Sequence, residues 1–93
     1  MIPLPYCVYV LKSQVDGDLY IGFTTDIIQR VTAHNSGSVP STAPRRPFAL
    51  VFCEYYPSKS DALRRETYLK TSAGHRALRL MLRDSLRTAT PQQ

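Results

Sequence analysis

The sequence has no tryptophan, only two cysteines and only seven acidic side chains among its 93 residues. Cys7 and Cys53 each lie in an apolar, strand-like segment, with no second Cys or His at metal-ligand spacing. This pattern argues against both a zinc site and a disulfide scaffold. We interpret the two cysteines as small buried hydrophobic residues in a reducing compartment.

Long apolar runs are also absent. The longest run, residues 48–53, is far shorter than the roughly 18–20 residues that a helix needs to cross a bilayer. Residues 1–5 do not resemble a secretory signal, which has a basic region followed by an apolar stretch. We therefore expect no membrane segment and a cytoplasmic location.

The composition fits one small folded domain. Apolar residues make up 43% of the chain, with six tyrosines and three phenylalanines, which is enough for a packed core and too many for a disordered basic tail. A chain of this length has room for one domain. We treat residues 1–93 as a single unit, with a core at about 6–87 and a polar tail at 88–93.

Positive charge is concentrated in the second part of the chain. The net charge is +5, with −1 in residues 1–35 and +6 in residues 36–93. Most of the cations are Arg, whose planar fork binds phosphate oxygens in pairs. A nucleic-acid backbone is the natural partner, and a solvated basic surface without a partner is the alternative. The candidate nucleic-acid contacts are Arg45, Arg46, Lys70, Arg76, Arg79 and Arg83.

Hydrophobic periodicity predicts secondary-structure elements in the order β-β-α-β-α-α. The expected fold class is α/β of the α+β type, a small, mainly antiparallel three-stranded sheet flanked by about three helices. A Ser-, Pro- and Gly-rich loop at 36–47 is longer than most connectors, which favours a function for it. The expected strands are residues 6–12, 19–23 and 48–56; the expected helices run from the capping cluster at 24–26 to about residue 35, over 58–71 and over 75–87.

The first two strands form a predicted hairpin with Asp16-Gly17 as its two turn residues. This register places Tyr9 opposite Thr24. Because side chains alternate along a strand, Tyr9 and Tyr20 then share one face of the hairpin.

The first and last predicted helices each present basic side chains on one face. Arg30 and His34 lie one turn apart, so they can project together toward whatever the first helix covers. In the last helix one face is basic and the opposite face is apolar. The basic face holds Arg76, Arg79, Arg83 and Arg87, and the apolar face holds Leu78, Met81, Leu82 and Leu86.

Glu66 is the most informative single position. It falls within the apolar stripe that should face the sheet, and an uncompensated buried charge is unfavourable. Either an Arg partner or a metal ion must neutralise it, and position alone does not choose between them. The candidate partners are Arg64, Arg65 and Arg30.

Taken together, three elements can bring reactive side chains to one place, although two tyrosines on one face are by themselves more often a matter of packing and a lone His is usually only a satisfied polar group. A Tyr can accept or relay a proton, an Arg neutralises phosphate charge and a carboxylate holds Mg²⁺, which meets the needs of phosphodiester hydrolysis. The candidate catalytic residues are Tyr9, Tyr20, Arg30, His34 and Glu66, with Glu66 as the candidate metal ligand.

These residues resemble the GIY-YIG nuclease family. The likeness extends from residue 6 to about residue 82 and is closest to the small stand-alone members of the family. The matching segments are Cys7-Val8-Tyr9 and Tyr20-Ile21-Gly22 for the paired strands, Thr24-Thr25-Asp26, Arg30 and His34-Asn35 for the first helix, and residues 62–66 for the helix with the metal-binding acid.

The resemblance implies a Mg²⁺-dependent endonuclease, with Mn²⁺ as another usable ion, that cuts DNA with low sequence specificity in repair, recombination or mobile-element processing. Glu66 would be the sole protein ligand of the ion. Tyr9 would be the general base or would position the water, with Tyr20 supporting it or contacting the phosphate. Arg30 would stabilise the pentacovalent phosphate, and His34 would assist by hydrogen bonding or proton transfer.

The sequence departs from the family pattern at two places. Cys7 stands at the first Gly of the GIY strand, and the Asn that some members carry after the metal acid is absent, since Asn35 is the only Asn. The second departure puts rate and substrate positioning in question. Two other hypotheses stay open: a non-catalytic nucleic-acid-binding module, with RNA as an alternative to DNA, and an interaction module of a larger repair or recombination complex.

Overall fold

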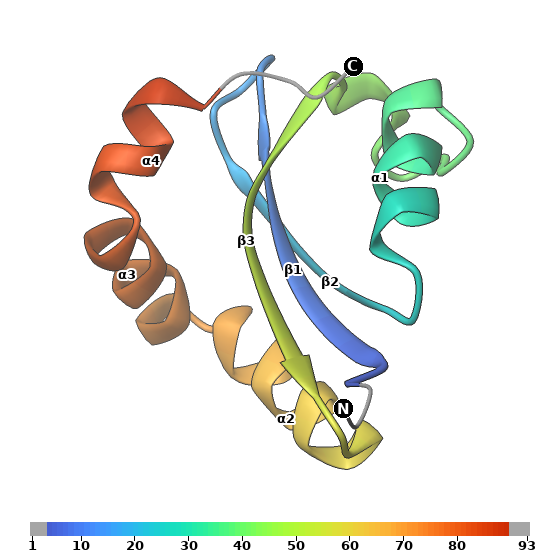
Figure 1. Ribbon diagram of the computed structural model, residues 1–93. Coiled ribbons are helices and arrows are strands. Elements are labelled where there is room, and N and C mark those ends of the chain that lie inside the picture. The colour runs from blue at the N-terminus through green and yellow to red at the C-terminus, as the bar shows by residue number, and fades with distance from the viewer. Residues whose placement is uncertain (1–3, 90–93) are drawn as a thin grey trace.

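The computed structural model describes residues 4–89, which form a three-stranded antiparallel sheet covered by helices on both faces (Figure 1). The strands are β1 (Tyr6–Ser13), β2 (Leu19–Thr24) and β3 (Phe48–Tyr56), in the spatial order β2-β1-β3. The expected α+β class is confirmed. β1 is the central strand, and β3 adjoins it at an edge of the sheet.

The predicted hairpin exists, but its predicted register is wrong by two residues. Tyr9 pairs with Gly22 instead of Thr24. The connection is longer than a two-residue turn because the Ser13 Oγ accepts hydrogen bonds from the amides of Val15 and Asp16, at 3.1 and 3.3 Å. The shift is an even number of residues, so Tyr9 and Tyr20 still lie on the same face.

The first predicted helix is confirmed as α1 (Ile27–Ser36). The Asp26 carboxylate accepts a hydrogen bond from the Gln29 amide at 3.1 Å and so caps the N-terminus. Gly37 ends the helix with a left-handed φ of 83°.

The segment that follows α1 is an ordered part of the fold. It contains a short 3₁₀ helix, η1 (Ala43–Arg45), and it buries Thr42 completely against α1. At its end, Asn35 of α1 accepts from the Phe48 amide at 2.7 Å and donates to the Phe48 carbonyl at 3.1 Å. The side-chain amide thereby joins α1 to the outer edge of β3.

The third and last helical segment differs from the prediction. α2 (Lys59–Leu69) is followed by α3 (Ser72–Met81) and α4 (Arg83–Thr88), so the expected single helix over 75–87 is wrong. The chain breaks at Leu82, where φ is −105° and ψ is 20°. With this break Leu78 and Leu86 are both buried, whereas Met81 is 53% exposed and does not belong to the apolar face.

The two ends of the predicted domain fall partly inside the described residues. Thr88 ends α4, so the predicted polar tail begins later than residue 88, and residues 90–93 lie outside the described part of the chain. None of the helices formed by residues 4–89 is long and apolar enough to span a membrane.

Each face of the sheet packs against its own set of helices (Figure 1). Val8 and Val10 of β1 point toward α2, α3 and α4, where they meet buried residues such as Leu69 and Leu78. The alternate β1 residues Tyr9 and Leu11 point toward α1. The sheet therefore separates an apolar core from a smaller layer that also contains polar side chains.

Candidate active site

The polar side chains of the α1 layer meet at the centre of β1. Tyr9 and His34 are both 0% exposed, and the Tyr9 hydroxyl lies 2.9 Å from the His34 Nε2. Tyr20, on the neighbouring strand, packs the edge of its ring against His34 with centroids 4.9 Å apart. Tyr9, Tyr20 and His34 thus form one cluster, as the shared face of the hairpin predicts.

Arg30 completes this cluster from the preceding turn of α1. The pKa of Arg30 is raised, mainly by its interaction with the Tyr9 hydroxyl and to a smaller extent by its interaction with the Tyr20 hydroxyl. Four of the five candidate catalytic side chains are therefore neighbours. The α1 helix supplies Arg30 and His34 at a spacing of one turn, and the hairpin supplies the two tyrosines.

Burial controls protonation within the cluster. Loss of solvent raises the pKa of Tyr9 to about 12, although the hydrogen bond from Arg30 opposes this change. Burial, assisted by the charge of Arg30, lowers the pKa of His34 to about 4. At neutral pH the Tyr9 phenol is protonated and the His34 imidazole is uncharged.

Glu66 lies on α2, in the layer on the other side of the sheet, with its side chain 17% exposed. Neither Arg64 nor Arg65 is its partner: these pair with Asp61 and Glu54. Lys70, the residue that caps the C-terminus of α2, holds the Glu66 carboxylate at 3.2 Å.

The structure does not bring Glu66 into contact with the cluster in the α1 layer; its ion-pair partner is Lys70. The Glu66 charge makes only the smallest of the contributions that shift the pKa of Tyr9.

The donor set around Glu66 fits a hard divalent cation better than zinc. Within residues 4–89 no three His, Cys, Asp or Glu side chains are grouped closely enough to hold a metal ion by themselves. Mg²⁺ needs no such group, because it retains several waters and uses one or two carboxylates together with substrate phosphates. Lys70 is exposed and can turn away from Glu66 when an ion arrives.

The predicted nucleic-acid contacts lie on two separate surfaces. In the loop, Arg45 pairs with Asp16 at 2.9 Å and Arg46 donates to the Ala43 carbonyl at 2.8 Å. In the layer on the other face of the sheet, exposed cations follow the end of α2 and lie on α3 and α4. These cations are Lys70, Arg76, Arg79 and Arg83.

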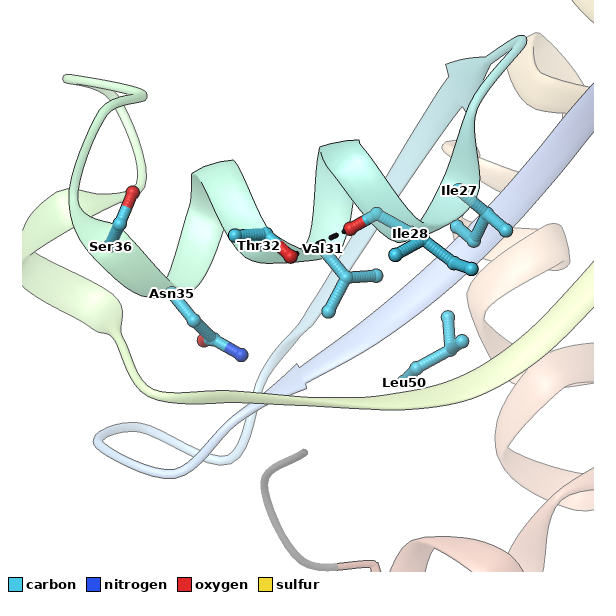
Figure 2. Close-up of a pocket in the computed structure, with 7 residues that line it drawn as sticks. All are labelled: Ile27, Ile28, Val31, Thr32, Asn35, Ser36 and Leu50. Carbon is cyan, nitrogen blue, oxygen red and sulfur yellow. Dashed lines mark hydrogen bonds between the residues drawn. The ribbon is translucent and has the colours of Figure 1, made fainter. Parts of the chain in front are cut away.

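A groove of about 530 Å³ runs between α1 and β3 (Figure 2). Ile27 and Val31 of α1 face Leu50 of β3 across it, and Ile28 at its rim is 79% exposed. The groove is apolar and holds none of the candidate catalytic side chains. Nothing in the structure shows what covers it.

Two residues that matter for the cluster were missed by sequence reasoning. Thr42 lies 2.8 Å from His34 Nδ1, and Asn35 fixes α1 to β3. Asn35 was matched to the first-helix pattern of the family but was given no role, and Thr42 lies in a loop without periodicity. The role of each residue depends on a contact distant in the sequence, with Phe48 for Asn35 and with His34 for Thr42.

The comparison with known families settles the family to which this arrangement belongs. The model of the GIY-YIG catalytic domain matches residues 5–77, a span that contains all five candidate catalytic residues. The chain belongs to the GIY-YIG family. The resemblance of the strand and helix motifs is thereby confirmed.

Its relatives are small proteins of similar length. A UPF0213 protein of Staphylococcus haemolyticus is 40% identical over 75 residues, covering 80% of this chain and 90% of the relative. A UPF0213 protein of Staphylococcus aureus is 44% identical over the same shares of both chains. The solution NMR structure of a UPF0213 protein from Bacillus halodurans is 35% identical, covers 82% of this chain and 83% of that chain, and has a TM-score of 0.53.

Proposed function

We propose that this GIY-YIG protein is a divalent-metal-dependent endonuclease that hydrolyses phosphodiester bonds of DNA with low sequence specificity. The observation that carries the proposal is the Tyr9–His34 hydrogen bond of 2.9 Å, with Arg30 against the same phenol. A buried phenol between a neutral base and a permanent cation is an unusual arrangement for core packing alone. The match to a catalytic-domain family supports the same interpretation.

In the proposed reaction the four clustered side chains serve the phosphate and the attacking water. Arg30 neutralises charge on the pentacovalent phosphate. The Tyr9 oxygen takes a proton from the water while its own proton passes to His34 Nε2, which is unprotonated at neutral pH. Tyr20 packs against His34 and limits its rotation.

Glu66 is the proposed ligand of Mg²⁺ or Mn²⁺. When bound, the ion polarises the phosphate and balances the charge of the leaving oxygen. Glu66 would hold the ion through its carboxylate, since such an ion needs only one or two protein carboxylates.

The basic surfaces support binding to a phosphate backbone without reading of bases. Phosphate contacts position a protein on nucleic acid and carry no sequence information. Arg79 lies 3.5 Å from Asp18, next to the start of β2, so it can meet a strand that passes the β2 edge. RNA offers the same phosphates, so an RNA substrate is tested alongside the DNA substrate.

A plasmid-nicking assay with Mg²⁺ tests the proposal. We expect the wild-type protein to nick supercoiled plasmid, Glu66→Gln to lose at least about 100-fold in rate, and EDTA to stop the reaction. Arg30→Ala should also lose activity while keeping the wild-type circular dichroism spectrum. Equal rates for wild type and Glu66→Gln would contradict the metal mechanism.

One observation favours a second candidate function, a non-catalytic nucleic-acid-binding module. The Lys70–Glu66 ion pair already satisfies the charge that a metal would otherwise neutralise. If no protein nicks plasmid at high concentration, yet all bind DNA with an affinity that falls steeply with added salt, this second function replaces the first.

A further inference from the structure

Thr42 stands behind His34 on the side away from Tyr9. It is 1% exposed, and its Oγ1 lies 2.8 Å from His34 Nδ1. The imidazole is thus held at both nitrogens by side chains from two other segments, Tyr9 of β1 and Thr42 of the loop before η1. Its orientation is fixed by these two hydrogen bonds.

The direction of the two hydrogen bonds follows from the groups beyond them. The Thr42 hydroxyl donates to the Val39 carbonyl at 3.4 Å and so offers its lone pairs to His34 Nδ1–H. A neutral imidazole carries one N–H, so Nε2 is then the acceptor and the Tyr9 O–H donates to it. The contact with Thr42 sets the tautomer, with the proton on Nδ1, and the contact with Tyr9 is compatible with it.

We infer that Thr42 is a positioning residue that holds His34 in the Nδ1–H tautomer, so that Nε2 is free to receive the proton of Tyr9. The alternative tautomer would leave the unprotonated Nδ1 facing the Thr42 oxygen, whose own proton goes to the Val39 carbonyl, and would remove the proton acceptor from the Tyr9 side. The catalytic consequence rests on the proposed function. The assignment of the tautomer does not, because it follows from the hydrogen bonds alone.

Because Tyr9, His34 and Thr42 are all buried, the fold favours one tautomer of His34 over the other. A buried polar atom that loses its hydrogen bond destabilises the folded state by about 1–3 kcal/mol. Moving the His34 proton to Nε2 would leave the Thr42 contact mismatched. The loop at 36–47 therefore contributes to the site through one hydroxyl group, whereas its two arginines point elsewhere.

The first experiment measures the tautomer directly on wild-type protein. Nitrogen-15 NMR distinguishes a protonated from an unprotonated ring nitrogen, and His75, the other histidine, serves as an internal reference. We expect His34 to show a protonated Nδ1 and an unprotonated Nε2 at pH 7. A protonated Nε2 in the wild-type protein would overturn the inference, whatever the outcome of the nuclease assay.

Two variants then test the role of the hydroxyl. Thr42→Val keeps the shape of the side chain and removes the acceptor, whereas Thr42→Ser keeps the acceptor. We expect Thr42→Val to populate the Nε2–H tautomer and to lower kcat about tenfold or more at unchanged KM, the scale seen for hydrogen-bond partners of catalytic histidines. Thr42→Ser should restore both readouts.

The combination of readouts separates the possible failures. A wild-type tautomer retained in a folded Thr42→Val protein would show that Thr42 does not set it. If Thr42→Val does not fold, the wild-type spectrum still tests the tautomer, and Thr42→Ser still tests the role of the hydroxyl group. If no variant has nuclease activity, the proposed function fails while the tautomer assignment is confirmed or overturned by the spectra.

Discussion

The phenol ring of Tyr9 lies directly over the Cα of Gly22, its partner on β2. A Cβ at residue 22 would overlap the Tyr9 Oη and Cζ atoms. Gly22 is therefore small to make room for the Tyr9 hydroxyl at the place where this hydroxyl meets His34. The two motifs of the hairpin, one ending in Tyr9 and one in Gly22, depend on each other sterically.

Gly22→Ala should accordingly disturb the site as well as the fold. We expect a loss of about 1–3 kcal/mol in the free energy of unfolding, measured by urea denaturation, because overpacked cores strain their neighbours. The same substitution in a Tyr9→Leu background removes the overlapping hydroxyl and should cost much less. Equal costs in both backgrounds would show that the overlap is relieved elsewhere.

The placement of the tyrosines shows why part of the site was predictable. The predicted register was wrong, yet Tyr9 and Tyr20 share a face because the error was an even number of residues. The pairing of Arg30 with His34 was predictable for a similar reason, since helical spacing alone brings them together.

Other parts of the site depend on contacts that no local pattern encodes. The partner of Glu66 is Lys70 on its own helix and not an arginine, a choice that depends on how α2 rotates against the sheet. The break at Leu82 depends on the shape of the core that Leu78 and Leu86 both enter. The Thr42–His34 contact requires the folded loop before it can form.

The low pKa of His34 predicts a loss of stability in mild acid. The folded protein keeps His34 neutral down to a pKa of about 4, whereas the unfolded chain binds the proton below about 6.5. The unfolded state therefore holds more protons between these values, so stability falls as the pH falls from 6.5 to 4. The expected change is about 3 kcal/mol from this group.

Denaturation curves at several pH values, for wild type and His34→Gln, measure this contribution. The variant has no titrating group at position 34, so the difference between the two proteins should shrink as the pH is lowered through this range. A difference that is constant from pH 7 to pH 4 would mean that the pKa of His34 is the same in the folded and unfolded states.

Removal of the Asn35 side chain should release α1 from the edge of β3. Asn35→Ala leaves the Phe48 amide and carbonyl without their partner, and we expect a loss of about 1–3 kcal/mol in unfolding free energy. Thr32→Ala is the matched control, since Thr32 is exposed on the same helix and bonds only to the Ile28 carbonyl (Figure 2). Similar costs for both variants would contradict the role assigned to Asn35.

The two cysteines should react slowly with thiol reagents in the native protein. Burial raises the pKa of the Cys7 thiol from 9.0 to about 12, which lowers its thiolate fraction about a thousandfold at neutral pH. The pKa of Cys53 is also raised by burial, but its side chain is partly exposed. We expect Cys53 to be labelled first, and Cys7 in a Cys53→Ser protein to be labelled only as fast as the protein unfolds. Rapid labelling of Cys7 in the native protein would show that β1 is open at this end.

We expect variants on the two basic surfaces to affect nucleic-acid binding differently. Arg76 and Arg79 are exposed on α3, and the ion pair of Arg79 with Asp18 is long, at 3.5 Å. Arg45 is held more closely by Asp16, at 2.9 Å, and lies over the Phe48 ring at 5.6 Å. In a Glu66→Gln background, which keeps the substrate intact, replacing both α3 arginines with Ala should weaken duplex binding. It should also reduce the slope of log affinity against log salt by about 0.9 for each phosphate that the variant no longer neutralises.

Arg45→Ala serves as the comparison for this binding experiment. Because Asp16 already holds Arg45, we expect this variant to lower the unfolding free energy by up to about 1 kcal/mol and to leave the salt dependence of binding nearly unchanged. The opposite pattern, in which Arg45→Ala reduces the slope and the α3 variant does not, would place the backbone along the loop beside His34. DNA would then approach the Tyr9 cluster from the C-terminal end of α1 instead of past the β2 edge.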